Sequence, residues 1–175
     1  TGALATPIYQ TSTYAQDAPN VHKGFDYSRA ANPTRQALEE NLAALEGVPF
    51  GVAFSSGLAA TSAILNLLKS GDHVVAANDM YGGTYRLFKQ LYEKYGIGFD
   101  FVDATQPEAL RAAMKPNTKM VWIETPSNPL LKITDLQAAA DVAHAGGALL
   151  AVDSTLATPY LQKPFSLGAD LVLHS

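Results

Sequence analysis

Polar residues and glycines follow several apolar runs of this sequence, at places where they could bind an anion or move a proton. The segments are residues 55–57, 78–83, 124–129, 153–155 and 174–175. Each apolar run is the length of a buried strand, and ligands of open α/β sheets bind outside the carboxyl ends of their strands. The spacing therefore predicts one ligand-binding crevice to which these five segments contribute.

The segment Ser-Ser-Gly-Leu-Ala-Ala at residues 55–60 joins an apolar run to a helical pattern. Backbone N–H groups at a helix start, together with the helix dipole, form a site suited to phosphate. No Gly-Lys-Ser/Thr follows, and the Gly-x-Gly-x-x-Gly spacing of dinucleotide sites is missing. Phosphate binding is therefore one hypothesis, and a serine N-cap followed by a tight glycine turn is the other.

Asp153 ends the apolar run 149–152, which places a carboxylate at the crevice with apolar walls behind it. A carboxylate in such surroundings needs hydrogen bonds or a cation to stay ionised. A protonated pyridine nitrogen is one fitting partner, the role that an aspartate has in pyridoxal-phosphate enzymes. A helix cap and a metal ligand are the alternatives, and metal is the weakest because no His or acidic cluster has ligand spacing.

Asn128 lies in a loop between Pro126 and Pro129. The prolines restrict the loop and so the direction of the amide, which can donate to an anionic oxygen and accept from another donor. An asparagine that bonds its own backbone in a turn is an equal alternative.

Two tyrosines accompany residues that suit a planar, phosphorylated ligand. Tyr81 precedes two glycines that allow close backbone approach, and its ring offers a flat face. Tyr27 and Arg29, far upstream, offer a phenol and a guanidinium that suit phosphate. Packing and surface solvation are the alternatives for each pair.

Composition excludes several classes of protein. The net charge of −4 argues against binding to nucleic acid or to an anionic membrane. The absence of cysteine excludes disulfides and thiolate metal sites. No apolar run approaches the roughly 20 residues of a membrane span, and residues 1–14 lack the features of a signal peptide. We therefore expect a cytoplasmic protein without a resident metal.

The elements that must position these residues alternate along the chain. Residues 1–32 predict an extended arm, and a helix then begins at Asn32 as N-cap with Pro33 in its first turn and ends at Gly47. Strands are predicted at 51–54, 73–77, 99–102, 120–124, 148–152 and 171–173, with helices at 58–68, 84–95, 107–114 and 136–144. This alternation predicts a three-layer α/β/α fold with a mainly parallel sheet. We expect the arm and first helix at 1–46 and the large domain at 47–175.

Both ends of the sequence suggest a piece of a longer protein. It opens without Met, and it closes directly after the predicted strand 171–173. A domain rarely ends on a buried strand.

Five motifs occur in an order that closely resembles the Cys/Met-metabolism family of pyridoxal-phosphate enzymes, the transsulfuration branch of fold type I. They are Tyr-Ser-Arg-Ala-Ala-Asn-Pro-Thr at 27–34, Ser-Gly-Leu-Ala-Ala at 56–60, Tyr-Gly-Gly-Thr at 81–84, Glu-Thr-Pro-Ser-Asn-Pro at 124–129, and Leu-Gly-Ala-Asp at 167–170 with His-Ser at 174–175. The resemblance covers essentially the whole chain.

The resemblance implies which residues bind the cofactor phosphate. Gly57 and Leu58 would donate backbone N–H groups, and Ser175 would add its hydroxyl. Tyr27 and Arg29 would reach the phosphate of a neighbouring subunit, so the active unit would be a dimer, with a tetramer built from two such dimers.

The resemblance also implies the residues around the pyridine ring. Tyr81 would stack on the ring and act in catalysis by assisting proton transfer to the leaving group. Asp153 would pair with the ring nitrogen, and Asn128 would hold the phenolic oxygen of the ring or the substrate carboxylate side. Thr155 would support these contacts.

Two departures from the family pattern matter. The family reads Val-Asp-Asn-Thr-Phe where residues 152–156 read Val-Asp-Ser-Thr-Leu, which affects packing more than Asp153 or Thr155. The Schiff-base lysine of the family follows in Ser-x-Thr-Lys, and the chain ends at that serine. We therefore expect that lysine beyond Ser175, and expect the chain by itself to lack this covalent link.

Within the family, the sequence most resembles cystathionine γ-lyases and γ-synthases, which would act on a sulfur amino acid. O-acetylhomoserine sulfhydrylases and methionine γ-lyases are the alternatives, the latter less favoured because they usually carry Cys where this chain has Gly83. A non-catalytic phosphate-binding α/β module is the alternative from another class. It would have no use for Tyr81, Asn128 or Asp153.

Overall fold

The computed structural model describes residues 2–175, which divide into two compact units. The first unit ends at Ala53, and the second is Phe54–Ser175. Among the described residues, no helix is both long and apolar enough to cross a membrane.

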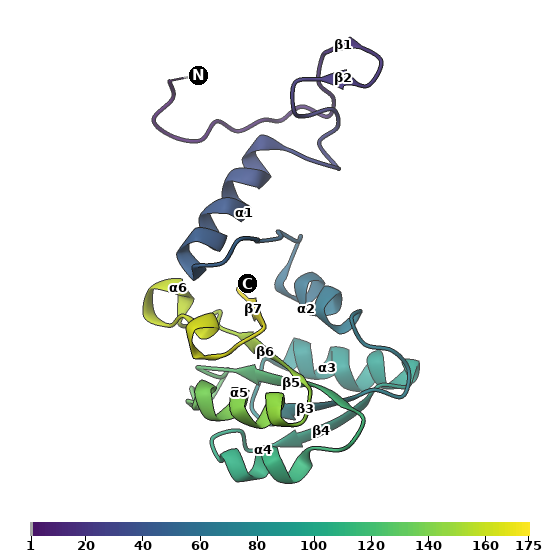
Figure 1. Cartoon of the computed structure of the whole chain (residues 1–175), viewed down its shortest axis with the longest axis vertical. Helices are drawn as coiled ribbons and strands as arrows, with labels where there is room; N and C mark the ends of the chain where they lie inside the picture. The colour runs from purple at the N-terminus through teal and green to yellow at the C-terminus, as the bar shows by residue number, and fades with distance from the viewer. Residues whose placement is uncertain (1) are drawn as a thin grey trace. The chain divides into compact units, whose positions relative to one another are not determined.

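The second unit is built on a five-stranded sheet (Figure 1). Its strands are β3 (His73–Ala77), β4 (Gly98–Val102), β5 (Thr118–Glu124), β6 (Leu149–Asp153) and β7 (Leu171–Leu173). They lie in the order β4-β3-β5-β6-β7, and every pairing is parallel. The chain runs from β3 to β4 on one side and then continues with β5 on the other. The strand order therefore reverses between β3 and β5, the point at which α/β sheets open a crevice for ligands.

Helices cover both faces of this sheet. They are α2 (Gly57–Leu65), α3 (Gly82–Gln90), α4 (Pro107–Ala113) and α5 (Leu136–Ala145), with the short α6 (Thr158–Leu161) and 3-10 turns at Tyr92–Tyr95 and Pro164–Leu167. Successive strand residues point to opposite faces. Val75 accordingly packs with Leu110 of α4, whereas Val74 packs with Phe88 of α3. The predicted three-layer α/β/α fold is confirmed.

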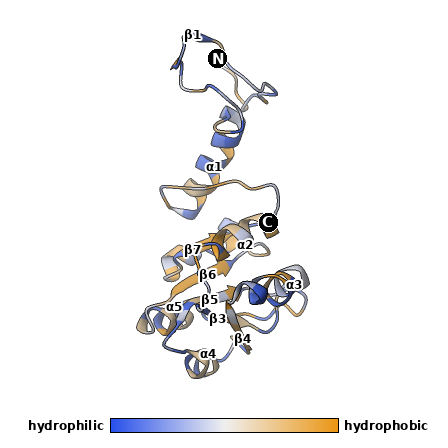
Figure 2. Cartoon of the chain, turned by 90° about the vertical axis from the view of Figure 1, so that its right-hand side faces the viewer, coloured by the Kyte–Doolittle hydropathy of each residue, from blue (hydrophilic) through white to orange (hydrophobic). Residues whose placement is uncertain are grey.

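Apolar composition explains why these strands lie in the centre. Along β3 and β5 nearly every residue is buried, and Figure 2 shows β6 and β7 as strongly hydrophobic. A parallel strand covered on both faces needs such a continuous apolar run. The polar residues that follow each run are therefore brought to one edge of the sheet.

The first unit holds a hairpin and one long helix. Strands β1 (Gln16–Ala18) and β2 (Val21–His22) pair antiparallel within the arm, and α1 spans Pro33–Glu46. Asn32 caps α1 by accepting a hydrogen bond from the Thr34 N–H at 2.9 Å. Gly47 ends the helix with φ of 75°, a conformation that favours glycine. Both predicted ends of this helix are confirmed.

The predicted strand at 51–54 is wrong. This segment has no strand partner, and the Ala53 N–H donates instead to the Glu39 carboxylate at 2.9 Å. Val52 is 71% exposed, so the apolar run is not covered as a central strand requires. The predicted helix at 84–95 is also interrupted, since α3 ends at Gln90 and a 3-10 turn follows.

Candidate functional site

A cavity of about 210 Å³ lies at the carboxyl ends of β3, β5, β6 and β7. Its lining residues are Tyr81, Glu124, Pro126, Asn128, Asp153, Thr155, Leu156 and Ser175. Five of these were candidates from the sequence: Tyr81, Asn128, Asp153, Thr155 and Ser175. The cavity therefore gathers side chains from segments up to 94 residues apart around one space.

Asp153 is one of two buried acids that line this cavity. It is the last residue of β6 and is 7% exposed. Thr155 donates to Oδ1 of Asp153 twice, from its N–H at 3.1 Å and from its hydroxyl at 2.5 Å. Burial raises the pKa of the Asp153 carboxyl above its ordinary value, against the Thr155 bonds and the nearby His174, which lower it. A cation in the cavity would favour the ionised form of this carboxyl and so lower its pKa.

Ser175 connects Asp153 and Thr155 with the start of α2. The Ser175 N–H donates to the Thr155 hydroxyl oxygen at 3.0 Å. On the other side, a Cβ added at Gly57 would overlap the Ser175 side chain. The glycine therefore permits a close approach between the first turn of α2 and the cavity wall.

The first turn of α2 presents backbone donors beside Ser175. Ser56 caps the helix and accepts from the Ala59 N–H at 3.1 Å. The first N–H groups of a helix have no acceptor within it, so those of Gly57 and Leu58 are suited to an anion. The predicted group of Gly57, Leu58 and Ser175 therefore lies together at one end of α2.

Tyr81 lies directly before α3, is half-exposed and lines the cavity. A Cβ added at Gly83 would overlap the Tyr81 ring. Glycine at this position lets the ring lie against the first turn of the helix.

Glu124 belongs to a predicted crevice segment, but the sequence interpretation gave it no role of its own. It is 5% exposed at the end of β5 and lines the cavity. Its Oε2 accepts from the Tyr81 N–H and its Oε1 from the Asn128 N–H, each at 2.8 Å. The pKa of Glu124 is raised to about 7: burial is the largest cause, the charges of Asp153 and Asp79 add to the rise, and the two N–H bonds oppose it. The available signal was a charged residue closing a run of buried ones.

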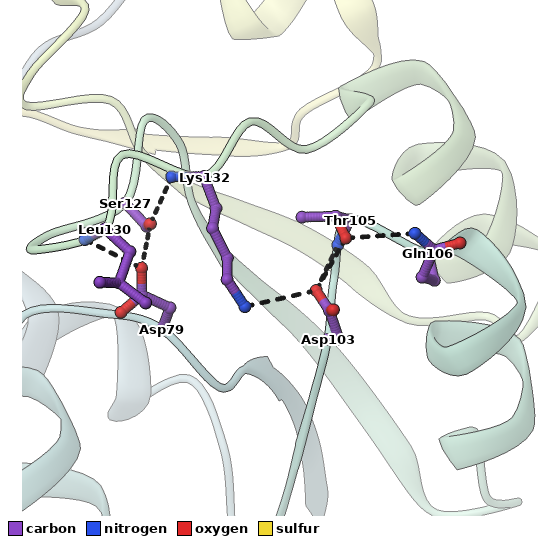
Figure 3. A network of polar contacts seen from close by, with 7 residues as sticks. All are labelled: Asp79, Asp103, Thr105, Gln106, Ser127, Leu130 and Lys132. Atoms are coloured by element: carbon purple, nitrogen blue, oxygen red, sulfur yellow. Dashed lines mark hydrogen bonds and ion pairs between the residues drawn. The ribbon is translucent and has the colours of Figure 1, made fainter.

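A second polar network lies beside Glu124 (Figure 3). The Asp79 carboxylate accepts from the Ser127 hydroxyl and from the Leu130 N–H, the latter at 3.3 Å. The Lys132 N–H donates to the Ser127 hydroxyl oxygen at 2.9 Å, and its ammonium lies 3.8 Å from Asp103. These contacts fix the loop that carries Asn128.

Tyr27 and Arg29 belong to the first unit. The Arg29 guanidinium lies 5.0 Å from the centre of the Tyr27 ring, a cation–π contact. In the described part of the chain, no group of three His, Asp or Glu residues could hold a metal ion.

The sequence matches the family described as Cys/Met metabolism PLP-dependent enzyme over residues 1–175. It is 53% identical to a probable cystathionine gamma-synthase of Herpetosiphon aurantiacus and 54% identical to the cystathionine gamma-lyase of Bacillus subtilis (strain 168). A cystathionine beta-lyase of Lactococcus lactis subsp. cremoris is 55% identical. Each alignment covers 100% of this chain, and 55%, 46% and 46% of the respective relative. The chain thus spans about half the length of these curated relatives.

Solved structures agree with this assignment. The crystal structure of metB from Corynebacterium glutamicum superposes with a TM-score of 0.96 at 51% identity, covering 99% of this chain and 46% of that one. The cystathionine gamma-lyase of Lactobacillus plantarum, complexed with L-serine, gives a TM-score of 0.94 at 46% identity, with 100% and 46% covered. This chain belongs to the Cys/Met-metabolism family of pyridoxal-phosphate-dependent enzymes, in its fold type I architecture.

Proposed function

We propose that the complete protein catalyses pyridoxal-phosphate-dependent γ-elimination or γ-replacement on a sulfur amino acid, in the manner of a cystathionine γ-lyase or γ-synthase. The observation that carries the proposal is the buried carboxylate of Asp153 in one cavity with Tyr81 and Asn128. A phosphate-binding module would need the start of α2 and no buried acid beyond it.

The residues present fit the cofactor at both of its ends. Phosphate would be held by the N–H groups of Gly57 and Leu58 and by the Ser175 hydroxyl. These groups lie close together because Gly57 has no Cβ that would overlap the Ser175 side chain. A protonated ring nitrogen would be the cation that lets the buried Asp153 carboxylate stay ionised.

The bound cofactor would supply an electron sink, and the chain's own residues would do the rest. Asp153 would hold the ring nitrogen in its protonated form, while Thr155 fixes the carboxylate through two hydrogen bonds. Tyr81 would cover the ring face and transfer a proton to the leaving group, a role worth about 10²–10⁴ in rate. Asn128 would hold the phenolic oxygen of the ring.

Sequence identity does not separate the reactions within the family. Relatives called γ-synthase, γ-lyase and β-lyase are 53%, 54% and 55% identical to this chain. The β-lyase relatives make β-cleavage of cystathionine the second candidate. The two cleavages break different carbon–sulfur bonds of the same thioether, so their thiol products distinguish them.

The test is a product assay on the complete protein with pyridoxal phosphate. We expect cysteine from cystathionine in the γ-elimination direction, or cystathionine from cysteine and an activated homoserine in the replacement direction. Homocysteine as the main thiol would establish β-cleavage instead. A protein that binds the cofactor but turns over none of these substrates would contradict the proposal.

The same proposal includes a homo-oligomer, a tetramer made of two active dimers, in which Tyr27 and Arg29 reach the neighbouring phosphate. Leu4 and Ile8 of the arm are fully or largely exposed, which supports a partner surface there. We also place the enzyme in the cytoplasm, in keeping with a family of cysteine and methionine metabolism. Sedimentation and cell fractionation test these two points.

Gly83→Ala is expected to lower kcat roughly tenfold to a hundredfold, because even small displacements of a positioned group are costly. The new methyl group would overlap the Tyr81 ring and push it from its place. Gly82→Ala is the matched control, since its Cβ would meet only the flexible end of Arg86 at 3.2 Å. Steady-state kinetics of both variants check this; equal rates for the two would contradict the proposed role of Tyr81.

A further inference from the structure

One carboxylate joins the two loops on either side of the point where the strand order reverses. Glu124 at the end of β5 uses Oε2 for the Tyr81 N–H and Oε1 for the Asn128 N–H, both at 2.8 Å. Tyr81 begins the helix after β3, whereas Asn128 belongs to the loop after β5. The carboxylate therefore fixes the separation between a ring-facing phenol and a loop amide.

A second carboxylate makes the reverse connection. Asp79, in the loop after β3, accepts from the Ser127 hydroxyl and the Leu130 N–H of the loop after β5 (Figure 3). The Glu124 carboxylate therefore binds the loop after β3, and the Asp79 carboxylate binds the loop after β5. Hydrogen bonds to an ionised acceptor are about twice as strong as neutral ones.

Resting on the proposed function, we propose that Glu124 is a positioning residue that sets Tyr81 and Asn128 jointly against the cofactor ring. It acts through two backbone N–H groups rather than through contact with the reacting atoms. Its ionised form has an acceptor for each N–H. The protonated form has one good acceptor and one hydroxyl, so one loop loses its hydrogen bond.

Its surroundings make this connection sensitive to pH near neutrality. The charged or titratable groups that face Glu124 are Tyr81 and Asp79 after β3, Asp153 of β6, and, around a small adjoining hollow, Asp103 and Lys132. Burial is the largest cause of the raised pKa of about 7 for Glu124, and the negative charges of Asp153 and Asp79 add to it. As pH falls through that value, the connection should loosen.

Three variants of the complete protein, loaded with pyridoxal phosphate, test this. Glu124→Gln keeps the side-chain shape but turns an NH₂ group toward one N–H donor. Asp79→Asn can keep both bonds, because both end on one oxygen, Oδ2, yet it removes a charge that raises the pKa of Glu124. Glu108→Gln is the control, since that side chain is 82% exposed on α4.

The readouts are the visible circular dichroism of the bound cofactor across pH 5 to 9, with kcat and KM. Relative to Glu108→Gln, we expect Glu124→Gln to lose a spectral titration centred near the pKa of about 7. We also expect it to lower kcat roughly tenfold with little change in KM. Asp79→Asn should move the titration to lower pH. If Glu124→Gln does not fold, this shift in Asp79→Asn tests the role of Glu124 by itself. Titration of the cofactor itself contributes to every spectrum, so the assignment to Glu124 rests on the differences from Glu108→Gln.

Superimposable spectra and equal kcat for Glu124→Gln and Glu108→Gln would overturn the inference while leaving the proposed function intact. An unshifted titration in Asp79→Asn would do the same. Failure of the unmodified protein to bind pyridoxal phosphate would instead overturn the proposed function itself.

Discussion

Asp153→Asn is expected to lower kcat/KM by about 10²–10³-fold, the cost of removing one group aimed at a developing charge. Asparagine has nearly the same shape and can still accept both Thr155 hydrogen bonds through its single oxygen, because both end on Oδ1. What it lacks is the charge that would keep a ring nitrogen protonated. Steady-state kinetics at pH 8 measure the loss, and Asp141→Asn on the exposed face of α5 is the control.

Stability separates this loss from simple damage to the fold. Burial raises the pKa of Asp153 in the folded state, so between the unfolded and folded pKa values the folded protein binds a proton that the unfolded chain does not. Stability contributed by this group is therefore lost as pH rises above the unfolded value of about 3.9. Without cofactor, Asp153→Asn should be at least as stable as the unmodified protein at neutral pH. Activity within about threefold of the control would contradict the role of Asp153.

Gly57→Ala is expected to weaken pyridoxal phosphate binding roughly tenfold to a hundredfold, the equivalent of losing one hydrogen bond to a charged group. The added Cβ would overlap the side chain of Ser175. The backbone N–H of Ser175 donates to the Thr155 hydroxyl oxygen, which restricts how far the residue can move. Ser175 must then move its hydroxyl away from the start of α2. Alanine itself favours the helix, so the loss should appear in affinity and not in folding.

Ser175→Ala and the double variant complete the experiment. If Gly57→Ala acts by displacing the Ser175 hydroxyl, removing that hydroxyl first makes the second change cost less. Titration with pyridoxal phosphate should therefore give losses that do not add, as expected for residues in contact. Strictly additive losses, or no loss in either single variant, would show that this end of α2 does not hold the phosphate.

Hydropathy patterning predicted much of the fold because each central strand contains a continuous apolar run of at least four residues. The bounds of β3 and β7 were predicted to the residue, since polar residues or glycines flank both runs. The segment 51–54 has the same apolar composition but no neighbouring strand, and pairing is not encoded in a run by itself. Composition predicts that a segment suits a sheet, whereas its neighbours decide whether it joins one.

The residues of the candidate site likewise differ in whether local sequence or strand order places them. Asp153 and Asn128 were predicted because each follows a strand, and strand ends meet at one edge of a parallel sheet. The role of Glu124 was not predicted, because its hydrogen bond to Tyr81 depends on β3 and β5 lying side by side, which the chain order alone does not indicate. Gly57 and Ser175 lie close together although they are 118 positions apart, and only the resemblance to the family had placed them in one group. Contacts of this kind follow from strand order, not from local spacing.

The crystal structure of the complete protein with pyridoxal phosphate is the most direct test of this account. We expect the phosphate at the N–H groups of Gly57 and Leu58, the ring beside Tyr81, and the ring nitrogen within hydrogen-bond distance of the Asp153 carboxylate. A cofactor bound elsewhere, or one whose ring nitrogen faces away from Asp153, would contradict it.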